Sequence, residues 1–448
     1  MSWKIVKLGE LLNESRIPCE NPNPDRRIKV KLKVLGVEKR GIETEIEGAT
    51  KQFIRKAGQF IYGKQNFHKG AFGIIPQELD GYESSADLPA FDVSEKCLPE
   101  WIFYFFKQGN YYLELSKIAR GVATQRIHPE QIYDLEIPLP DIKTQKEFLS
   151  KINSLENNGD ELKSELTHQL TLVKKLRQQL LQDAVQGKLV EQIKKEEPAS
   201  DLLRKIKDEK QKLIAEKVIK QGKLQEAEKQ EDLLFNIPNN WVWCKLDELC
   251  RNITDGTHQT PTYTQDGIPF ISAQHVKPFK FTPDNRKYVS YEAYLECTKN
   301  KKPEIGDILI TRVGAIGEAA VIDIKMDFAF YVSLGLIQPL INLVNSRYIE
   351  LVINSPYGNS YSKGNVSSKG SSAGNYNLGR LRSFQIPLPP PTEQNRIIQK
   401  LDELMQYCNE LEASIKESES QNEKLLQQVL REALRPAPKN SNKKSAAV

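Results

Sequence analysis

The segment Ile137-Pro138-Leu139-Pro140 returns 249 positions later as Ile386-Pro387-Leu388-Pro389. A match of four residues arises easily by chance, but this one continues in register for about fifty residues, which indicates an internal duplication. The same offset relates Gln145 to Gln394, Lys151 to Lys400, Leu162 to Leu411, Gln178-Gln179 to Gln427-Gln428, Leu181 to Leu430 and Ala184 to Ala433.

The beginnings of the two copies also match, but at a shorter offset. Gly58 corresponds to Gly306, 248 positions later. At an offset of 238, Trp3, Lys7, Leu8, Glu10 and Leu11 match Trp241, Lys245, Leu246, Glu248 and Leu249. The second globular part therefore carries about eleven extra residues in its middle. Similar ends with divergent middles are expected of two copies of one scaffold that recognise different things.

After each of these segments the chain lacks proline and is rich in Leu, Glu, Lys and Gln, which predicts long helices over residues 143–188 and 392–435. In both, apolar residues recur at alternating spacings of three and four, as in a heptad seam with a few polar interruptions. The predicted packing positions are Ile152, Leu155, Leu162, Leu166, Val173, Leu176 and Leu180 in the first helix, and Leu401, Leu404, Leu411, Ile415, Leu425 and Val429 in the second.

Connectivity favours antiparallel pairing of these helices. A helix of about forty residues is about 60 Å long. The first helix leads away from the first globular part, and the second can return along it without a long connection. This predicts two globular parts separated by the helices and related by an approximate two-fold axis. The alternatives are that each helix covers its own domain or binds another protein.

The expected fold class is α+β, with two mixed α/β domains and two long antiparallel coiled-coil helices between them. Between the first helix and the second domain, the charged stretch contains a proline-initiated helical arm that is either a solvated connector or a docking surface. The expected segments are a first domain at 1–142, a first spacer helix at 143–188, a charged helical connector at 189–235, a second domain at 236–391, a second spacer helix at 392–435 and a disordered tail at 436–448.

Composition excludes several classes of protein. The six cysteines are scattered without a Cys-x-x-Cys pair and the five histidines are dispersed, so neither a disulfide framework nor a metal site is indicated. The N-terminal residues lack the apolar region of a secretory signal, and the most apolar stretch, 328–344, is interrupted by Gln338, Pro339 and Asn342. We expect a reduced, cytoplasmic protein without a membrane partner. A net charge of +5 requires any binding of DNA to rest on local basic surfaces.

No grouping of residues in the sequence indicates a nucleophilic triad, and none of the local motifs needed for methyl transfer or nuclease chemistry is recognisable. We therefore expect no catalytic residues and no cofactor bound by this chain.

In the first globular part, residue types that bond bases and phosphates gather in two predicted loops. These candidates are Lys64, Gln65, Asn66, His68 and Lys69, which follow an apolar strand, and Gln125 with Arg126. A further segment, 26–33, alternates like a strand with one basic face. It is equally well explained as a solvated edge strand.

In the second globular part, the candidates lie in turns and directly after short apolar strands. They are Thr257, His258, Gln259, Gln274, His275, Arg312, Lys369 and Asn375. Each of them taken singly is explained by ordinary loop surface. Together they predict a basic and polar cleft suited to nucleic acid.

The whole arrangement resembles the specificity subunit of type I restriction–modification systems. The resemblance covers nearly the whole chain and rests on the order and duplication of its motifs. These are the Trp-x-x-x-Lys-Leu-x-Glu-Leu openings, the IPLP…Gln segments before long helices, Asp255-Gly256-Thr257-His258, Gly306-Asp307-Ile308-Leu309 and Glu197-Pro198-Ala199-Ser200-Asp201-Leu202-Leu203.

This resemblance implies a prokaryotic, non-catalytic DNA-recognition subunit. Its two target recognition domains would each read half of a bipartite, asymmetric site in double-stranded DNA. Two modification subunits, which methylate adenine, and restriction subunits would assemble on it, and S-adenosylmethionine, ATP and Mg²⁺ would belong to those partners. The first half of the chain lacks the Asp-Gly-Thr-His and Gly-Asp-Ile-Leu segments, so its mode of recognition is inferred less directly. The alternatives are a coiled-coil adaptor that reads no DNA and a stand-alone DNA-modifying enzyme.

Overall fold

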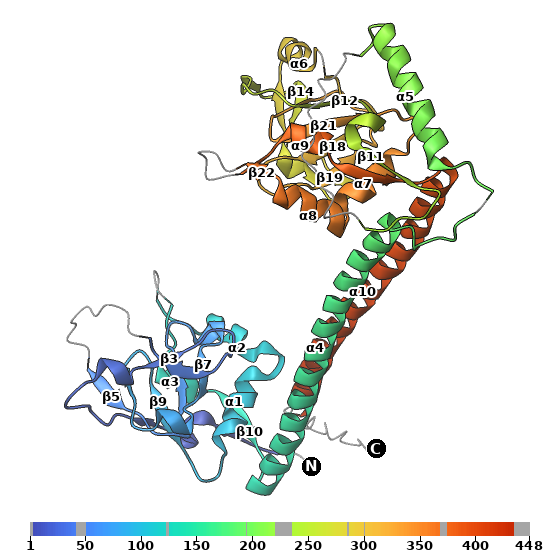
Figure 1. The fold of residues 1–448 in the computed structure, drawn as a ribbon. Helices are drawn as coiled ribbons and strands as arrows, with labels where there is room; N and C mark the ends of the chain where they lie inside the picture. The colour runs from blue at the N-terminus through green and yellow to red at the C-terminus, as the bar shows by residue number, and fades with distance from the viewer. Residues whose placement is uncertain are drawn as a thin grey trace, which may run out of the picture. The chain divides into compact units, whose positions relative to one another are not determined.

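The computed structural model describes residues 3–41, 51–121, 125–193, 195–219, 235–284, 286–299, 301–367 and 374–433. The chain forms two compact units (Figure 1). Unit 1 comprises Met1–His168 and Ile415–Val448, and unit 2 comprises Gln169–Ser414. Each unit therefore contains a mixed α/β domain and part of each of the two long helices, α4 (Ile142–Val185) and α10 (Pro391–Ala433).

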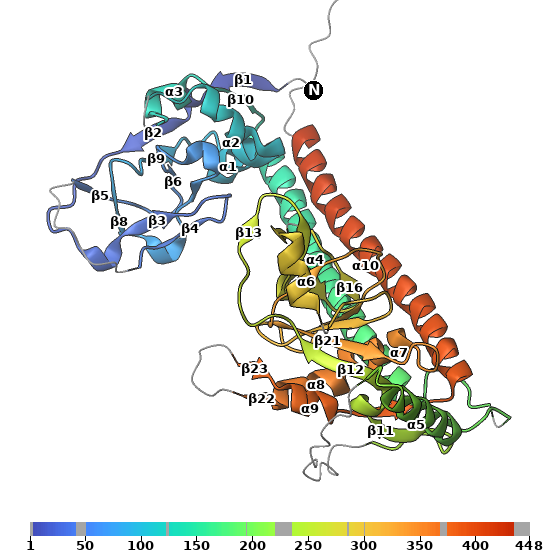
Figure 2. The ribbon, with the colours of Figure 1, turned by 90° about the horizontal axis from the view of Figure 1, so that it is seen from above.

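Unit 1 is built around a four-stranded sheet with the strand order β2-β9-β6-β7. Figure 2 labels β2, β9 and β6 of this sheet. One of its two inner strands, β6, is wholly buried. Helix α1 begins at a proline, the residue favoured in the first turn of a helix. The described elements of this domain are β1 (Lys4–Lys7), β2 (Leu12–Ser15), β3 (Ile28–Val30), β4 (Val37–Lys39), β5 (Gln52–Ile54), β6 (Phe60–Tyr62), β7 (Phe72–Ile74), β8 (Glu83–Ser85), β9 (Ala90–Val93), α1 (Pro99–Lys107), α2 (Tyr111–Glu114), α3 (Pro129–Tyr133) and β10 (Glu136–Leu139).

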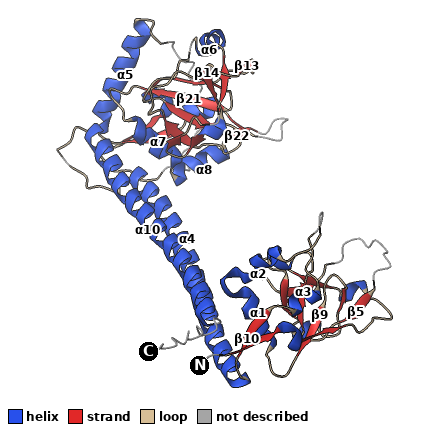
Figure 3. Cartoon of the chain, turned by 180° about the vertical axis from the view of Figure 1, so that it is seen from behind, coloured by secondary structure: helices blue, strands red, loops and turns tan. Residues whose placement is uncertain are grey.

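Unit 2 repeats this sheet with the order β12-β21-β18-β19 and adds a second one, β13-β17-β14-β20. Figure 3 draws the strands of both units in red. Its described elements are α5 (Ala199–Ala215), β11 (Val242–Lys245), β12 (Cys250–Asp255), β13 (Tyr263–Thr264), β14 (Ile268–Ile271), β15 (Val276–Lys277), β16 (Lys280–Phe281), β17 (Lys287–Val289), α6 (Tyr291–Thr298), β18 (Ile308–Thr311), β19 (Ala319–Val321), β20 (Ala329–Phe330), β21 (Leu334–Pro339), α7 (Ser346–Asn354), α8 (Pro356–Gly364), β22 (Val366–Ser367), β23 (Asn375–Tyr376), α9 (Leu378–Arg382) and β24 (Gln385–Leu388).

The two sequence offsets relate the first and the last strand of each domain, and these two strands pair with each other in both units. In unit 1, β1 pairs antiparallel with β10, so that Lys4 lies opposite Leu139 and Lys7 opposite Glu136. In unit 2, β11 pairs with β24 in the same register, Val242 opposite Leu388 and Lys245 opposite Gln385. The beginning and end of each domain thus form one two-stranded ladder, and the residues that change the offset lie between these strands.

A buried glutamine fixes the start of each long helix. The Gln145 side chain donates to the carbonyl of Pro140 (2.9 Å) and accepts from the backbone N–H of Leu98 (2.8 Å), just before α1. Gln394 makes the equivalent bonds to Pro389 and to Asn345, just before α7, both at 3.0 Å. The repeated glutamine therefore joins three segments of each domain: the closing strand, a packed helix and the long helix.

The long helices run antiparallel where they meet within each unit. In unit 1, Asn422 donates to the carbonyl of Gly159 at 3.2 Å, and Leu430 is buried in a cluster with Ile152. In unit 2, Arg177 bonds to Glu412 (2.5 Å) and Asn409 (2.7 Å), while Leu181 and Leu401 share a cluster.

Of the predicted packing positions, those spaced by seven residues are buried or partly buried, whereas most of the alternate positions are exposed. Ile152, Leu166, Val173, Leu401 and Ile415 are buried, and Leu180, Leu404 and Val429 are partly buried. The side chains of Leu155, Leu162, Leu176, Leu411 and Leu425 are instead 40–60% exposed. Residues next to the exposed positions contact the partner helix instead: Arg177, which follows Leu176, bonds to Glu412, which follows Leu411.

The connector, residues 189–235, contains one described helix, α5. Helix α5 starts after Pro198, and Leu202, Leu203 and Ile206 bury its apolar side in the core of unit 2. Residues 220–234 of the connector and the predicted tail, 436–448, lie outside the described residues. Within the described part of the chain, no helix has the length and apolar character needed to span a membrane.

Candidate nucleic-acid interface

The first predicted loop of unit 1 turns on a buried aromatic ring. After β6, Phe67 inserts into the core and stacks on Tyr62 with 4.6 Å between ring centroids. Gly70 closes the turn with a φ of +82°, a conformation that suits glycine. Because Phe67 is the anchor, the flanking polar residues stay near the surface: Lys64, Gln65, Asn66 and His68 are half-buried and Lys69 is exposed.

The second predicted loop of unit 1 lies directly beside the first. Arg120 and Arg126 pair through two backbone hydrogen bonds of 2.8 Å, and the next residue, Ile127, donates to the carbonyl of Lys64 (2.9 Å). Asp87 joins the two loops: its carbonyl accepts from the backbone N–H of Lys64 (2.9 Å), and its carboxylate lies 3.6 Å from Arg126. Exposed Gln125 belongs to the same surface.

His68 differs from its neighbours in protonation. Its burial, and secondarily the charge of Lys69, lower the pKa of the His68 imidazole below its ordinary value. Within the described residues, the Nδ1 atom is buried and has no hydrogen-bond partner. At neutral pH this side chain is therefore an uncharged donor and acceptor rather than a cation.

In unit 2, the Asp255-Gly256-Thr257-His258 turn follows β12. A Cβ on Gly256 would lie 2.3 Å from the backbone of Phe330 and Tyr331, so the close approach requires glycine. Thr257 then donates its N–H to Phe330 (3.0 Å) and accepts from Val332 (3.0 Å). This fixed backbone leaves the side chains of His258 and Gln259 exposed.

Arg312 is buried rather than presented to solvent, which corrects the prediction that it reaches DNA. It is 6% exposed, and its guanidinium bonds to the Asp255 carboxylate (2.5 Å) and to the carbonyls of Tyr376 (3.0 Å) and Val332 (3.2 Å). A single side chain therefore ties the Asp255 turn, the turn before β21 and the β23 strand together. Sequence reasoning missed this because a basic residue after a strand does not reveal which way it points.

His275 requires the same correction. Its side chain is buried, and its Nδ1 accepts from the backbone N–H of Ser272 at 3.0 Å, which closes a short turn after β14. The neighbouring Gln274 is exposed. Asn375 is half-buried in β23, and Lys369 lies outside the described residues.

The equivalent basic residues of the two units have different surroundings. Lys64 and Arg312 both follow the central strand of the repeated sheet, at the offset that relates Gly58 to Gly306. Asp255 corresponds, at the offset of the N-terminal strands, to Ile17. Unit 1 thus has an apolar residue where unit 2 has the carboxylate that holds Arg312.

The model of the type I restriction modification DNA specificity domain matches residues 1–172 and 238–418, one match over each half of the duplication. The chain belongs to the family of type I restriction–modification specificity subunits.

Individual relatives agree with this family. The chain is 27% identical to the specificity subunit of the type I restriction enzyme EcoEI of Escherichia coli over 257 residues, 54% of this chain and 42% of the relative. It is 24% identical to that of EcoBI, also of E. coli, over 338 residues, 74% and 65% of the two chains. The matched part thus spans less than two thirds of either relative.

Solved structures share the fold over nearly the whole chain. The crystal structure of the HsdS subunit from Thermoanaerobacter tengcongensis has a TM-score of 0.56 at 19% identity, covering 97% of both chains. A chain from a study of complex assembly and conformational transition of the type I restriction–modification system has a TM-score of 0.60 at 20% identity, covering 97% of this chain and 98% of the other.

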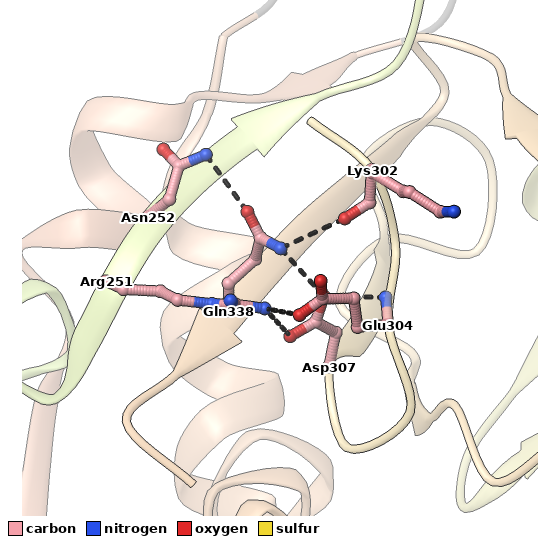
Figure 4. A network of polar contacts seen from close by, with 6 residues as sticks. All are labelled: Arg251, Asn252, Lys302, Glu304, Asp307 and Gln338. Atoms are coloured by element: carbon pink, nitrogen blue, oxygen red, sulfur yellow. Dashed lines mark hydrogen bonds and ion pairs between the residues drawn. The ribbon is translucent and has the colours of Figure 1, made fainter. Parts of the chain in front are cut away.

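A second polar network of unit 2 lies in the β12-β21-β18-β19 sheet, at the end opposite to Asp255 and Arg312 (Figure 4). Arg251 bonds to Glu304 and to buried Asp307 (3.2 Å), and Gln338 donates to Asp307 (2.8 Å). Burial raises the pKa of Asp307, while the bonds from Gln338 and Arg251 oppose the shift. The network fixes the Gly306-Asp307 turn and is remote along the strands from Asp255, so it supports the sheet rather than the exposed loops. Its signal in the sequence was the Gly-Asp pair itself.

Proposed function

We propose that this chain is the DNA-reading subunit of a type I restriction–modification complex, with one half-site of a bipartite, asymmetric sequence read by each unit. The observation that carries the proposal is the repeated scaffold. Closing strands, sheet order and the buried glutamine recur in both units, whereas the segments inserted between them differ. A duplicated support with different inserts suits a reader of two unlike half-sites.

The side chains proposed to contact DNA are those that the loops leave accessible. In unit 1 they are Lys64, Gln65, Asn66, His68, Lys69, Gln125 and Arg126, which two adjoining loops bring to one surface. In unit 2 they are Thr257, His258, Gln259 and Gln274, with Arg312 holding the turn that carries the first three. Lysine and arginine suit phosphates and guanine, and the amides suit adenine.

We further propose that α4 and α10 form an antiparallel spacer, with the two recognition domains related by an approximate two-fold axis. Both domains would enter major grooves on one face of the duplex, about one helical turn or 34–36 Å apart. The length of the spacer would then fix the number of unread base pairs between the half-sites.

Catalysis is assigned to partner subunits. The family's role implies two modification subunits, which would carry S-adenosylmethionine, and restriction subunits, which would use ATP and Mg²⁺. The chain itself would select the site and scaffold the assembly. Within the described ranges, no three His, Cys, Asp or Glu side chains gather as a possible metal site.

The deciding experiment maps methylated adenines in host DNA with and without the gene. We expect one bipartite motif that disappears on deletion and returns on complementation. Replacing only the residues between β2 and β10 with those of a relative should change one half-site and preserve the other.

Other outcomes identify the rival functions. A methylation pattern that does not depend on the gene contradicts the proposal and favours a coiled-coil adaptor. Methylation or cleavage of DNA by the isolated chain, supplied with S-adenosylmethionine or Mg²⁺, would indicate a stand-alone enzyme.

A further inference from the structure

Strands β3 and β4 of unit 1 form an antiparallel ribbon (Figure 2). Ile28 pairs with Lys39 and Val30 with Val37, and within the described residues neither strand pairs with a third. Although the basic alternation of 26–33 was equally consistent with a solvated edge strand, the structure shows a two-stranded hairpin. It is absent from the repeated sheet and belongs to the divergent middle of the domain.

The ribbon is strongly basic. Seven of the fifteen residues at positions 26–40 are Lys or Arg, and Glu38 is the one acid among them. Glu38 pairs with Lys31 (2.9 Å) and lies 4.0 Å from Lys29. No carboxylate of the described residues lies within ion-pair distance of four further exposed cations, Arg26, Lys33, Lys39 and Arg40. This surface is therefore complementary to a polyanion.

The tip of the ribbon is held in a costly backbone conformation. Lys33 and Val34 have φ values of +57° and +58°, a region that is rare for any residue with a Cβ and rarer still for a β-branched one. Two hydrogen bonds hold them: Lys33 donates to the carbonyl of Lys69 (2.9 Å) and Val34 to that of Gly70 (2.8 Å). The strained tip is thus fixed to the Lys64–Lys69 loop, which is already a candidate DNA contact.

The same conformation directs the apolar side chains of the tip to opposite sides. Val34 turns inward and packs against the core of unit 1. Leu32 and Leu35 turn outward and are 44% and 66% exposed. A turn of this kind ordinarily carries Gly, Asn or Asp. Two exposed leucines on a strained backbone within a basic ribbon point to an apolar contact with a bound partner.

We propose that the β3–β4 ribbon enters the major groove of the first half-site and that Leu32 and Leu35 contact the 5-methyl groups of thymine. The major groove admits a two-stranded β-ribbon, and the thymine methyl is the apolar group that a base edge presents there. The free cations of the ribbon would neutralise the flanking phosphates. This inference rests on the proposed function. It adds an apolar contact with thymine, which the hydrogen-bonding candidate residues do not provide.

The test replaces thymine by uracil, which removes the methyl group and retains the base pair. The full chain, assembled with its modification subunits, is titrated with duplexes in which each half-site of the mapped motif is substituted separately. We expect a loss of affinity of about fourfold for each contacted methyl, in one half-site only. In the variant carrying Leu32→Ala and Leu35→Ala, the thymine duplex should already bind more weakly, and uracil should cost nothing further.

Leu295→Ala, at a comparably exposed leucine of α6, is the matched control and should retain the full effect of uracil. Thermal unfolding of all variants checks that the fold is intact. The inference is overturned if uracil costs the same in the leucine variant and the wild type, if uracil costs nothing in the wild type, or if the half-site holds no thymine. If the wild type prefers no sequence at all, the proposed function itself has failed.

Discussion

Arg312 holds three loops of unit 2 with one guanidinium, and its removal would leave the carboxylate of Asp255 and two carbonyls without their donor. Loss of one partner of a buried ion pair costs about 3–5 kcal/mol. We expect Arg312→Ala to lower the free energy of unfolding of unit 2 by this amount, measured by urea denaturation. His258→Ala is the control, since that exposed side chain lies 3.3 Å from the same carboxylate and should change stability by less than about 0.5 kcal/mol. Equal effects of the two substitutions would contradict the assignment.

Glu350 is a buried carboxyl on α7 whose Oε1 accepts from the backbone N–H of Val321 at 2.9 Å. Burial raises its pKa from 4.5 to about 7. Since the folded protein holds this proton more tightly than the unfolded chain, the stabilisation is complete below pH 4.5. It is lost as the pH rises toward 7, by about 3 kcal/mol in total.

Glu350→Gln should therefore remove this part of the pH dependence while keeping the bond to Val321. Thermal melts of the variant and the wild type between pH 4.5 and 8 measure the difference. Parallel pH profiles would show that Glu350 does not titrate in this range.

At the scale of elements, the residues that are buried along the long helices differ from those that the heptad pattern predicts. Leu430 is fully buried in the core of unit 1, whereas Leu425, a predicted seam position, is 60% exposed. We expect Leu430→Ala to destabilise unit 1 by about 2–5 kcal/mol and Leu425→Ala by less than about 0.5 kcal/mol in chemical denaturation. A larger loss of stability from Leu425→Ala than from Leu430→Ala would instead support the packing positions inferred from the heptads.

The existence and extent of both long helices could be predicted from the absence of proline and the apolar periodicity. Which residues flank the buried positions on the partner side could not, because a small rotation of the helix exchanges one flanking residue for its neighbour while the apolar pattern stays the same. The candidate loops show a similar division. The loop at Lys64 could be located from the sequence. The inward turn of Arg312 depends on bonds to residues distant in the chain, whereas His275 is turned inward within a short local turn closed at Ser272.

At the scale of the whole molecule, the proposed spacer function makes helix length a determinant of the DNA motif. Residues 163–169 and 412–418 are repeat-equivalent heptads. Their joint deletion removes about 10 Å from each helix and nearly preserves its facing side. We expect methylation mapping to show unchanged half-sites with about three fewer unread base pairs between them.

Deleting only one of these heptads misaligns the pair and should reduce methylation without creating a new motif. Altered half-site sequences after either deletion would show that the helices do not set the spacing.

The burial of Leu430 in unit 1 also has a consequence for synthesis on the ribosome. Domains generally fold as they emerge, beginning with the N-terminal one. Here the core of unit 1 includes Leu426, Val429 and Leu430, which are made after nearly all of the chain. Some 290 residues separate them from β10, or roughly 15–60 s at the usual elongation rate of about 5–20 residues per second. All residues of unit 2 are synthesised before the last segment of unit 1. Unit 1, which is begun first, is therefore completed last.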